Sequence, residues 1–178
     1  MENWKVTHTS DTTLLRKVVP KDLTSISTQS RTELRNFNGE LCRLGHGSSF
    51  ALEDTVLGKR PIVGGEVLLK MNPSVGPGKY RTSCWTISIH DSMMEAFYKQ
   101  IDEKTDHIYA LKGTQVIFEY DENNKPFVIT TIEEGQKAVM SISKTDNIRD
   151  RYSAKVEKIT DQEYDHVLQN YMDNRKWN

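Results

Sequence analysis

The sequence predicts an α+β fold, in which a single, mainly antiparallel sheet of about five to seven strands carries two or more amphipathic helices. Three observations predict it. Apolar and polar residues alternate with a period of two over residues 79–90 and 114–132, as in half-buried strands. The period becomes that of a helix over residues 94–101 and again over 164–172. Ahead of each of these stretches stands a Ser or Thr with a Glu at the spacing of a capping box.

Length and composition indicate a soluble globular protein that is kept inside a cell, in the cytoplasm. The 178 residues suffice for one domain with its own core, and the formal net charge of −1 argues against a surface that binds nucleic acid everywhere. Two cysteines are too few for a disulfide framework, which favours a reducing compartment. No apolar run approaches the roughly 20 residues that span a bilayer. We therefore expect no transmembrane segment, and peripheral contact with a membrane stays open.

Residues 1–38 are polar and rich in Ser and Thr, whose side chains compete for backbone hydrogen bonds. We expect an N-terminal arm or a series of short elements there, followed by one globular domain over residues 39–178. Residues 27–36 are predicted to form a short helix. Residues 12–19 form an apolar octet that is too short for its period to distinguish strand from helix, so both alternatives stay open.

The segment from residue 39 to 78 contains most of the glycines and prolines of the chain, which indicates loops, where functional residues often lie. Within it, residues 50–57 are predicted to form a short helix that ends at Gly58. Residues 66–72 are predicted to form a strand that pairs with residues 79–90 in a hairpin. The second strand then leads directly into the helix predicted from Ser92 to Ile101.

The rest of the chain is expected to be a meander closed by a helix. Residues 114–120 and 127–132 are predicted to form a hairpin, and further strands are expected over residues 137–144 and 152–159. A closing helix from Thr160 to about Asn174 should pack on the sheet. The predicted core consists of Trp85, Ile87, Ile89, Met94, Phe97, Ile101, Val116, Phe118, Ile129, Met140, Val156, Val167, Leu168 and Tyr171.

Only one set of residues suggests a metal site, namely Cys42, His46, Cys84 and His90. Their spacing, C-x3-H followed by C-x5-H, lacks the close cysteine pairs of structural zinc sites. We therefore predict no metal and no cofactor. Cys84, beside Trp85 in a strand, is interpreted as a packing residue and not as a nucleophile.

The string H-G-S-S at residues 46–49, with Leu52, Leu57 and Gly58 after it, resembles the H-G-S or H-G-T segment of ADP-ribosyltransferases. The resemblance covers this short stretch only. It implies that His46, Gly47 and Ser48 hold the ribose and nicotinamide of NAD, and that His46 is a candidate catalytic residue.

The same resemblance implies a later tyrosine or second histidine, and often a glutamate. Tyr80, Tyr98 and Glu119 are available for these roles, although none stands in a recognisable motif. The alternative interpretation is a glycine-flanked loop in which His46 makes hydrogen bonds to its neighbours.

The build of the chain, rather than any motif, favours a non-enzymatic assembly or binding protein. A compact sheet with two helices, a Ser/Thr-rich first segment and scattered polar residues is typical of small viral matrix, coat and accessory proteins. Such a protein would associate with itself as a homo-oligomer, or with a larger protein, through an arm or an edge strand.

Nucleic-acid binding is the third alternative. Its candidate residues are Trp4 and the basic residues of the first segment, namely Lys5, Arg16, Lys17, Lys21, Arg31 and Arg35. The near-zero net charge argues against this alternative.

Overall fold

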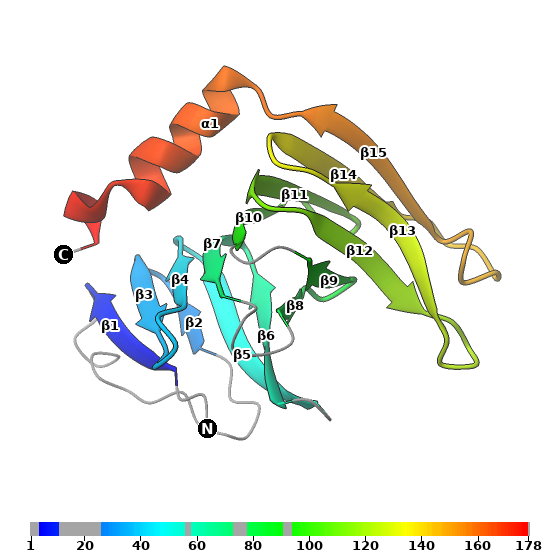
Figure 1. The fold of residues 1–178 in the computed structure, drawn as a ribbon, viewed down its shortest axis with the longest axis horizontal. Helices are drawn as coiled ribbons and strands as arrows, with labels where there is room; N and C mark the ends of the chain where they lie inside the picture. Colours follow the sequence, from blue (N-terminus) through cyan, green and yellow to red (C-terminus); the bar gives the residue numbers. More distant parts are fainter. Residues whose placement is uncertain (1–3, 11–25, 56–57, 73–77, 91–93, 178) are drawn as a thin grey trace.

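The computed structural model describes residues 4–10, 26–55, 58–72, 78–90 and 94–177, which form two packed β-sheets and a C-terminal helical segment (Figure 1). Sheet A has eight strands in the order β1-β3-β4-β7-β10-β11-β14-β15, and sheet B has seven in the order β13-β12-β9-β8-β6-β5-β2. Neighbouring strands pair antiparallel, except β6 and β8, which pair in parallel.

The strands of sheet A are β1 (Lys5–Thr9), β3 (Thr32–Arg35), β4 (Leu41–Leu44), β7 (Glu66–Met71), β10 (Met94–Gln100), β11 (Thr105–Lys112), β14 (Gln136–Ile142) and β15 (Tyr152–Lys158). The strands of sheet B are β2 (Ile26–Thr28), β5 (Ser48–Thr55), β6 (Gly58–Gly64), β8 (Lys79–Arg81), β9 (Thr86–Ile89), β12 (Gln115–Tyr120) and β13 (Pro126–Ile132).

The helical segment begins with α1 (Asp161–Val167), continues as a π-helical turn over Leu168–Met172 and ends in a 3-10 turn over Asn174–Lys176. The Thr160 hydroxyl accepts a hydrogen bond from the backbone of Glu163, whose carboxylate accepts one from the backbone of Thr160, so the predicted capping box is confirmed. In the part of the chain that the structure describes, no helix has the length and apolar character needed to cross a membrane.

The predicted α+β class is wrong, because the protein is mainly β. The clearest error is the helix predicted from Ser92 to Ile101, where Met94–Gln100 form strand β10 between β7 and β11. Met94 and Tyr98 point into the main core and Phe97 into a second core on the other face of sheet A. A strand that is buried on both faces has apolar residues on both of them, such as Phe97 beside Tyr98, and these can mimic a helical stripe.

Two further predicted helices are also wrong. Residues 27–36 contribute to strands β2 and β3, and residues 50–55 belong to strand β5, in which Phe50 and Leu52 are buried at a period of two. Hydroxyl-rich segments and short apolar runs carry little periodic signal, so the pairing partners determine their conformation.

The predicted hairpin between residues 66–72 and 79–90 is wrong as well. Strand β7 pairs with β4 and β10 in sheet A, whereas residues 79–90 lie in sheet B. These residues form two strands, β8 and β9, which pair with each other. The Thr82 hydroxyl accepts hydrogen bonds from the backbone of Cys84 and Trp85, and this turn interrupts what appeared in sequence as one alternating strand.

From residue 114 onward the predicted elements are confirmed, although the expected meander is divided, since β12 and β13 lie in sheet B and β14 and β15 in sheet A. β12 and β13 form the expected hairpin, β14 and β15 occupy the two expected strand regions, and a helix follows Thr160. Before residue 39, the described residues form β1, β2 and β3, and Trp4, Val6 and Leu34 are buried in the main core. Residues 12–19 lie outside the described residues.

The main core lies between the two sheets and includes Phe50, Tyr80 and Trp85 from the side of sheet B and Leu69, Tyr98 and Met140 from sheet A. Nine predicted core residues are buried, namely Trp85, Ile87, Ile89, Met94, Phe97, Phe118, Met140, Val167 and Tyr171. Val116 and Ile129 are half-buried. Ile101, Val156 and Leu168 are wrong as core residues, since they are 45%, 40% and 39% exposed.

Candidate functional site

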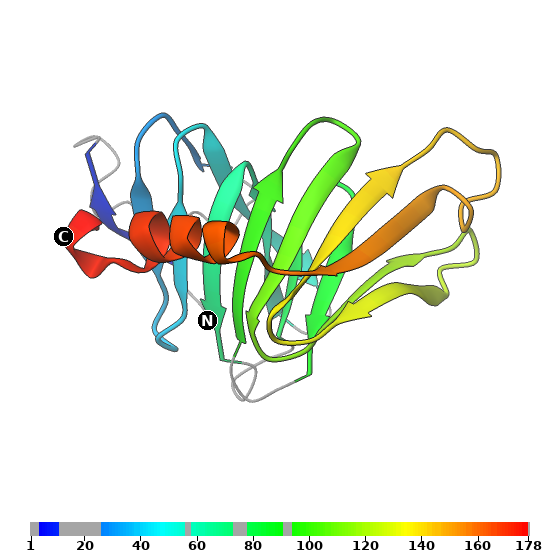
Figure 2. The same cartoon turned by 90° about the horizontal axis from the view of Figure 1, so that it is seen from above.

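The C-terminal helical segment lies on the outer face of sheet A, the face that points away from sheet B, and crosses its strands toward β1 (Figures 1 and 2). Beneath it is a second hydrophobic core, which is built from Leu68, Phe97, Tyr109, Leu111, Val167, Tyr171 and Trp177. The ring centroids of Phe97 and Tyr171 are 4.8 Å apart, and those of Phe97 and Tyr109 are 5.5 Å apart. Burial of these aromatic rings holds the segment on the sheet.

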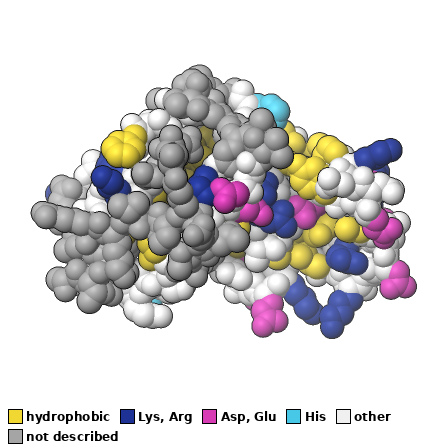
Figure 3. Space-filling view, turned by 90° about the horizontal axis from the view of Figure 1, so that it is seen from below, with side chains coloured by type: hydrophobic (Ala, Val, Ile, Leu, Met, Phe, Trp, Pro, Cys, Tyr) yellow, Lys and Arg dark blue, Asp and Glu magenta, His cyan; other side chains and the backbone are white. Residues whose placement is uncertain are grey.

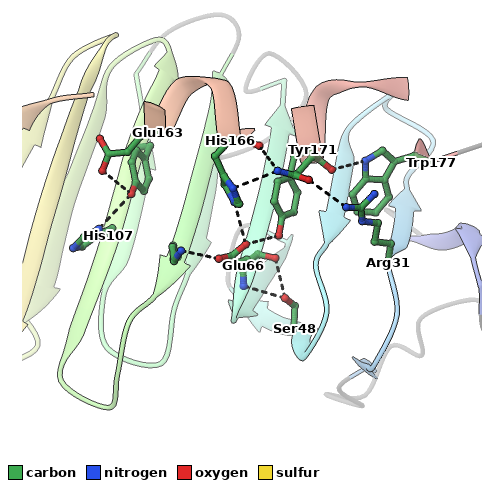
Figure 4. A network of polar contacts seen from close by, with 11 residues as sticks. Arg31, Ser48, Glu66, His107, Glu163, His166, Tyr171 and Trp177 are labelled. Atoms are coloured by element: carbon green, nitrogen blue, oxygen red, sulfur yellow. Dashed lines mark hydrogen bonds and ion pairs between the residues drawn. The ribbon is translucent and has the colours of Figure 1, made fainter. Parts of the chain in front are cut away.

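A polar cluster around Glu66, at the start of β7, fastens the segment from below (Figure 4). Its carboxylate accepts a hydrogen bond from the Tyr171 hydroxyl at 2.7 Å and forms ion pairs with Lys99 at 2.9 Å and His166 at 3.5 Å. Burial alone would raise the pKa of Glu66, but the hydrogen bonds from Lys99 and Tyr171 outweigh this and hold it below the ordinary value. Glu66 is therefore a charged structural anchor.

A second polar cluster surrounds Arg43 in β4, whose side chain is 3% exposed. Its guanidinium donates hydrogen bonds to the Glu33 carboxylate at 2.8 Å, the Tyr171 carbonyl at 2.6 Å and the Asn174 side chain at 2.7 Å. It also lies 5.3 Å from the ring centroid of Trp177. Because a buried guanidinium needs a partner for its donors, Arg43 fixes the end of the helical segment on the sheet.

A groove of about 300 Å³ runs between α1 and the strands β10 and β11. We call it the α1 groove, and its lining consists of Phe97, Lys99, Ile101, His107, Tyr109, Gln162, Glu163, His166 and Val167. Apolar rings form its base, whereas Ile101, 45% exposed, lies at its edge in the turn after β10. A groove with an apolar base and a mixed polar wall is the common form of a binding site.

The ionisable groups of the α1 groove are bound to one another. Glu163 accepts hydrogen bonds from Lys137 at 2.5 Å and from the Tyr109 hydroxyl at 3.3 Å, and His107 Nδ1 lies 3.3 Å from that hydroxyl. Burial would raise the pKa of Glu163, but the Lys137 and Thr160 hydrogen bonds lower it overall. Burial, followed by the Lys137 charge, lowers the pKa of His107. Every carboxylate here has an internal partner, which favours a structural role over acid–base chemistry.

The residues of the predicted NAD loop are not brought together with their proposed partners. His46 and Gly47 are exposed in the turn between β4 and β5, whereas Tyr80 and Tyr98 are buried between the sheets. Ser48 is buried and its hydroxyl bonds the backbone of Glu66. The catalytic and cofactor roles of His46, Gly47 and Ser48 stay predictions.

The residues considered for a metal site lie apart in the fold. Cys42 is buried in β4 of sheet A, and burial raises the pKa of its thiol well above the ordinary value. Cys84 is half-buried in the turn between β8 and β9 of sheet B, and His46 and His90 are exposed. Among the described residues, no three His, Cys, Asp or Glu side chains form a group that could hold a metal ion.

The basic residues proposed for partner or nucleic-acid binding have different surroundings. Lys5 is exposed and its ammonium lies 5.1 Å from the ring centroid of Phe37. Arg35 pairs with Glu33 at 2.7 Å, and Arg31 lies over Trp177. The other three candidates, Arg16, Lys17 and Lys21, lie outside the described residues.

Sequence reasoning missed the residues that fasten the helical segment, above all Arg43 and Glu66. Their partners in the folded chain are far away in sequence, since Tyr171 is 105 residues from Glu66 and 128 residues from Arg43. A buried Arg or Glu in a strand has no sequence pattern of its own. The only available signal was the charged residue within an otherwise apolar strand.

Large apolar side chains are exposed at three places in the described chain. Tyr164 lies on α1, Leu168 begins the π-helical turn that follows it, and Ile101 lines the α1 groove. Val128 and Val156 belong to the edge strands β13 and β15, and Phe37 lies in the turn between β3 and β4. In the view of Figure 3, hydrophobic, basic and acidic side chains are interspersed at the end that contains β12 and β13. The C-terminal helical segment combines exposed apolar residues with the neighbouring α1 groove. This surface is therefore our candidate binding surface.

The described residues form a β-sandwich. The C-terminal helical segment is held on the outer face of its sheet A by the clusters around Glu66 and Arg43. No protein-family model and no curated protein matches the sequence. Two crystal structures of a candidate anti-sigma factor from Parabacteroides distasonis ATCC 8503, at 2.50 and 1.65 Å resolution, resemble this fold with a TM-score of 0.56. The identity is 14%, and the match covers 83% of this chain and 65% of the other, which is slightly less than two thirds of its length. A resemblance at this identity shows the fold alone, and it gives no support to a viral matrix-like class.

Proposed function

We propose that this protein acts by binding another protein, without catalysis, and that the partner is a bacterial sigma factor. The resemblance in fold to the candidate anti-sigma factor supports the class of partner. The observation that carries the proposal is the α1 groove, which exposed Ile101 lines, together with exposed Tyr164 and Leu168 on the same helical segment. Tyrosine is enriched among the anchor residues of protein interfaces, and the exposed aliphatic side chains beside it add apolar surface that a partner can cover.

The state of the polar groups supports the same conclusion. The carboxylates of Glu66 and Glu163 and the guanidinium of Arg43 are held by partners within the chain. A partner would therefore meet a preorganised surface, and little side-chain ordering would oppose binding. The strand edges are less suited to a partner strand. β13 starts with Pro126 and carries a bulge near Ile129, and β15 carries several charges.

The test mixes the purified full chain with each purified sigma factor of its source organism and measures complex formation by size exclusion with light scattering. The dissociation constant of the original chain is then compared with that of a double variant that carries both Tyr164→Ser and Leu168→Ser. The matched control is Val128→Ser with Val156→Ser, which removes a similar pair from the edge strands. We expect the α1 variant to bind at least about tenfold more weakly, a loss of about 1.4 kcal/mol, and the control to bind like the original chain.

Two results would overturn the proposal. In the first, the original chain forms no complex with any sigma factor at tens of micromolar, roughly the weak limit of specific interfaces. In the second, the control variant loses binding while the α1 variant does not, which would move the interface to the edge strands. Light scattering of the chain alone, over a concentration series, separately tests the self-association that the sequence suggested.

A further inference from the structure

The turn between β3 and β4 displays an aromatic side chain on a rigid support. The Asn36 side-chain oxygen accepts hydrogen bonds from the backbone of Asn38 and of Glu40, each at 3.0 Å, and its amide donates to the Glu40 carboxylate at 2.6 Å. The second Glu40 oxygen accepts from the backbone of Asn72 at 3.1 Å. Asn36 and Glu40 are 8% and 7% exposed, so the polar groups that shape this turn are buried beneath it.

Phe37 is at the tip of that turn and is 72% exposed, which is the highest value for a large apolar side chain in the described residues. Single exposed apolar residues are common and by themselves indicate nothing. Phe37 differs because a buried hydrogen-bonded network fixes the backbone on both sides of it. A preorganised aromatic side chain loses little conformational entropy when a partner covers it, and this is the property of an interface anchor.

The surroundings of Phe37 carry an excess of positive charge. Lys5 lies 5.1 Å from the centre of its ring, and Lys5 is paired with Arg35 directly across strands β1 and β3. Like charges at such positions destabilise a sheet. The carboxylates near this turn are engaged within the chain, since Glu33 accepts hydrogen bonds from Arg35 and Arg43, and Glu40 accepts them from Asn36 and Asn72. In Figure 3, hydrophobic and basic side chains lie next to each other at the end of the molecule that contains β1 and β3.

This surface is continuous with the outer face of sheet A that holds the helical segment. Trp177 contacts Arg43, Arg43 and Arg35 share Glu33, and Arg35 pairs across strands with Lys5. A partner that covers α1 and extends along this face would therefore reach Phe37.

We propose that Phe37, Lys5 and Arg35 form the second contact of the protein partner, and that they bind an acidic segment of it in which an apolar pocket receives the Phe37 ring. The proposal rests on the proposed function, because it takes the same partner. Charge complementarity identifies the segment as acidic, and the isolated, rigid ring identifies the pocket as apolar.

The experiment measures the dissociation constant of the complex with the sigma factor for Phe37→Ser and Lys5→Glu, at 50 and 300 mM NaCl. Both residues are exposed, so neither change should affect folding, and unchanged thermal unfolding verifies this. The matched controls are Val128→Ser, which replaces another exposed apolar side chain with Ser on β13, and Lys158→Glu, which makes the same charge reversal on β15. We expect Phe37→Ser to weaken binding at least tenfold at either salt concentration. Lys5→Glu should weaken binding at low salt and reduce its salt dependence.

Three outcomes would overturn the inference. If the original chain binds a sigma factor and both variants bind equally well, the inference fails and the proposed function stands. If the original chain binds none, both fail. A fluorescein-labelled single-stranded oligonucleotide that binds the original chain, but neither variant, while sigma-factor binding is unaffected, would assign this surface to nucleic acid instead.

Discussion

The indole Nε1 of Trp85 donates a hydrogen bond of 2.6 Å to the carboxylate of Asp106, and both side chains are buried between the two sheets. Nearby Tyr98 is 1% exposed, and its hydroxyl lies beside the same carboxylate. Among the described residues, Asp106 forms no ion pair. Burial raises the pKa of Asp106, and hydrogen bonding from Trp85 and Tyr98 opposes that rise only in part. The core thus contains a carboxyl group that folding favours in its neutral form.

Asp106→Asn should make the protein more stable near neutral pH and have little effect in acid. Because the pKa is raised in the folded state, the unfolded chain releases this proton first as the pH rises, and the native state loses stability above the ordinary pKa of 3.8. The Asn side chain stays neutral throughout. The measurement is the free energy of urea unfolding of both proteins from about pH 4 to pH 7. The difference should grow with pH.

Asp121→Asn provides the control for this prediction, with the opposite sign. Backbone hydrogen bonding from Lys125 and the Arg149 side chain lower the pKa of Asp121, so its charged form stabilises the folded state above the ordinary pKa. This variant should lose stability relative to the original chain as the pH rises. Equal pH profiles for the original chain and Asp106→Asn would show that Asp106 ionises as easily in the core as in water.

Phe97→Ala should destabilise the protein by about 3 to 5 kcal/mol, because it removes a ring that is 1% exposed and packs on Tyr109 and Tyr171. Phe37→Ala is the matched control and should change the free energy of unfolding by less than about 0.5 kcal/mol. Chemical denaturation measures both. A small loss for Phe97→Ala would mean that the C-terminal helical segment does not cover this face of sheet A in solution.

Arg43→Met should cost about 3 to 5 kcal/mol, because it leaves Oε2 of the buried Glu33 carboxylate and the Tyr171 carbonyl without the donor they have in Arg43. Arg175→Met removes an arginine from the same helical segment whose side chain is 89% exposed, and it should leave stability nearly unchanged. Thermal unfolding compares the two. Similar melting temperatures for both variants would contradict the role of Arg43 as the anchor of the segment.

Gly65→Ala should be more harmful than Gly39→Ala, although both glycines have positive φ angles, +86° and +77°. A methyl group at Gly39 meets open space, so the cost is the left-handed conformation alone, about 1–2 kcal/mol. At Gly65 the new Cβ would also lie 2.7 Å from the Cα of Ser48, which requires the backbone to move. Denaturant unfolding measures the loss of unfolding free energy in each variant. Equal losses would mean that Ser48 lies farther from Gly65 than the structure places it.

Local signals in the sequence determined the β12–β13 hairpin, the strands β14 and β15, and the capped helix after Thr160. Each depends on contacts between neighbours in the chain, namely turn residues, an alternation on one buried face, or a cap. The core positions Trp85, Ile87 and Ile89 were predictable for the same reason.

Only the tertiary structure decided the rest. Met94–Gln100 form a strand because β7 and β11 flank them and because the C-terminal segment buries Phe97 on the outer face. Likewise, Glu66 and Arg43 acquire their roles from Tyr171, which is more than a hundred residues away in sequence. Burial on both faces of a strand erases the period of two, and long-range polar pairs leave no local pattern. Sequence alone therefore predicted a helix over residues that form strand β10, because the two sheets and the C-terminal helical segment bury this strand on both faces.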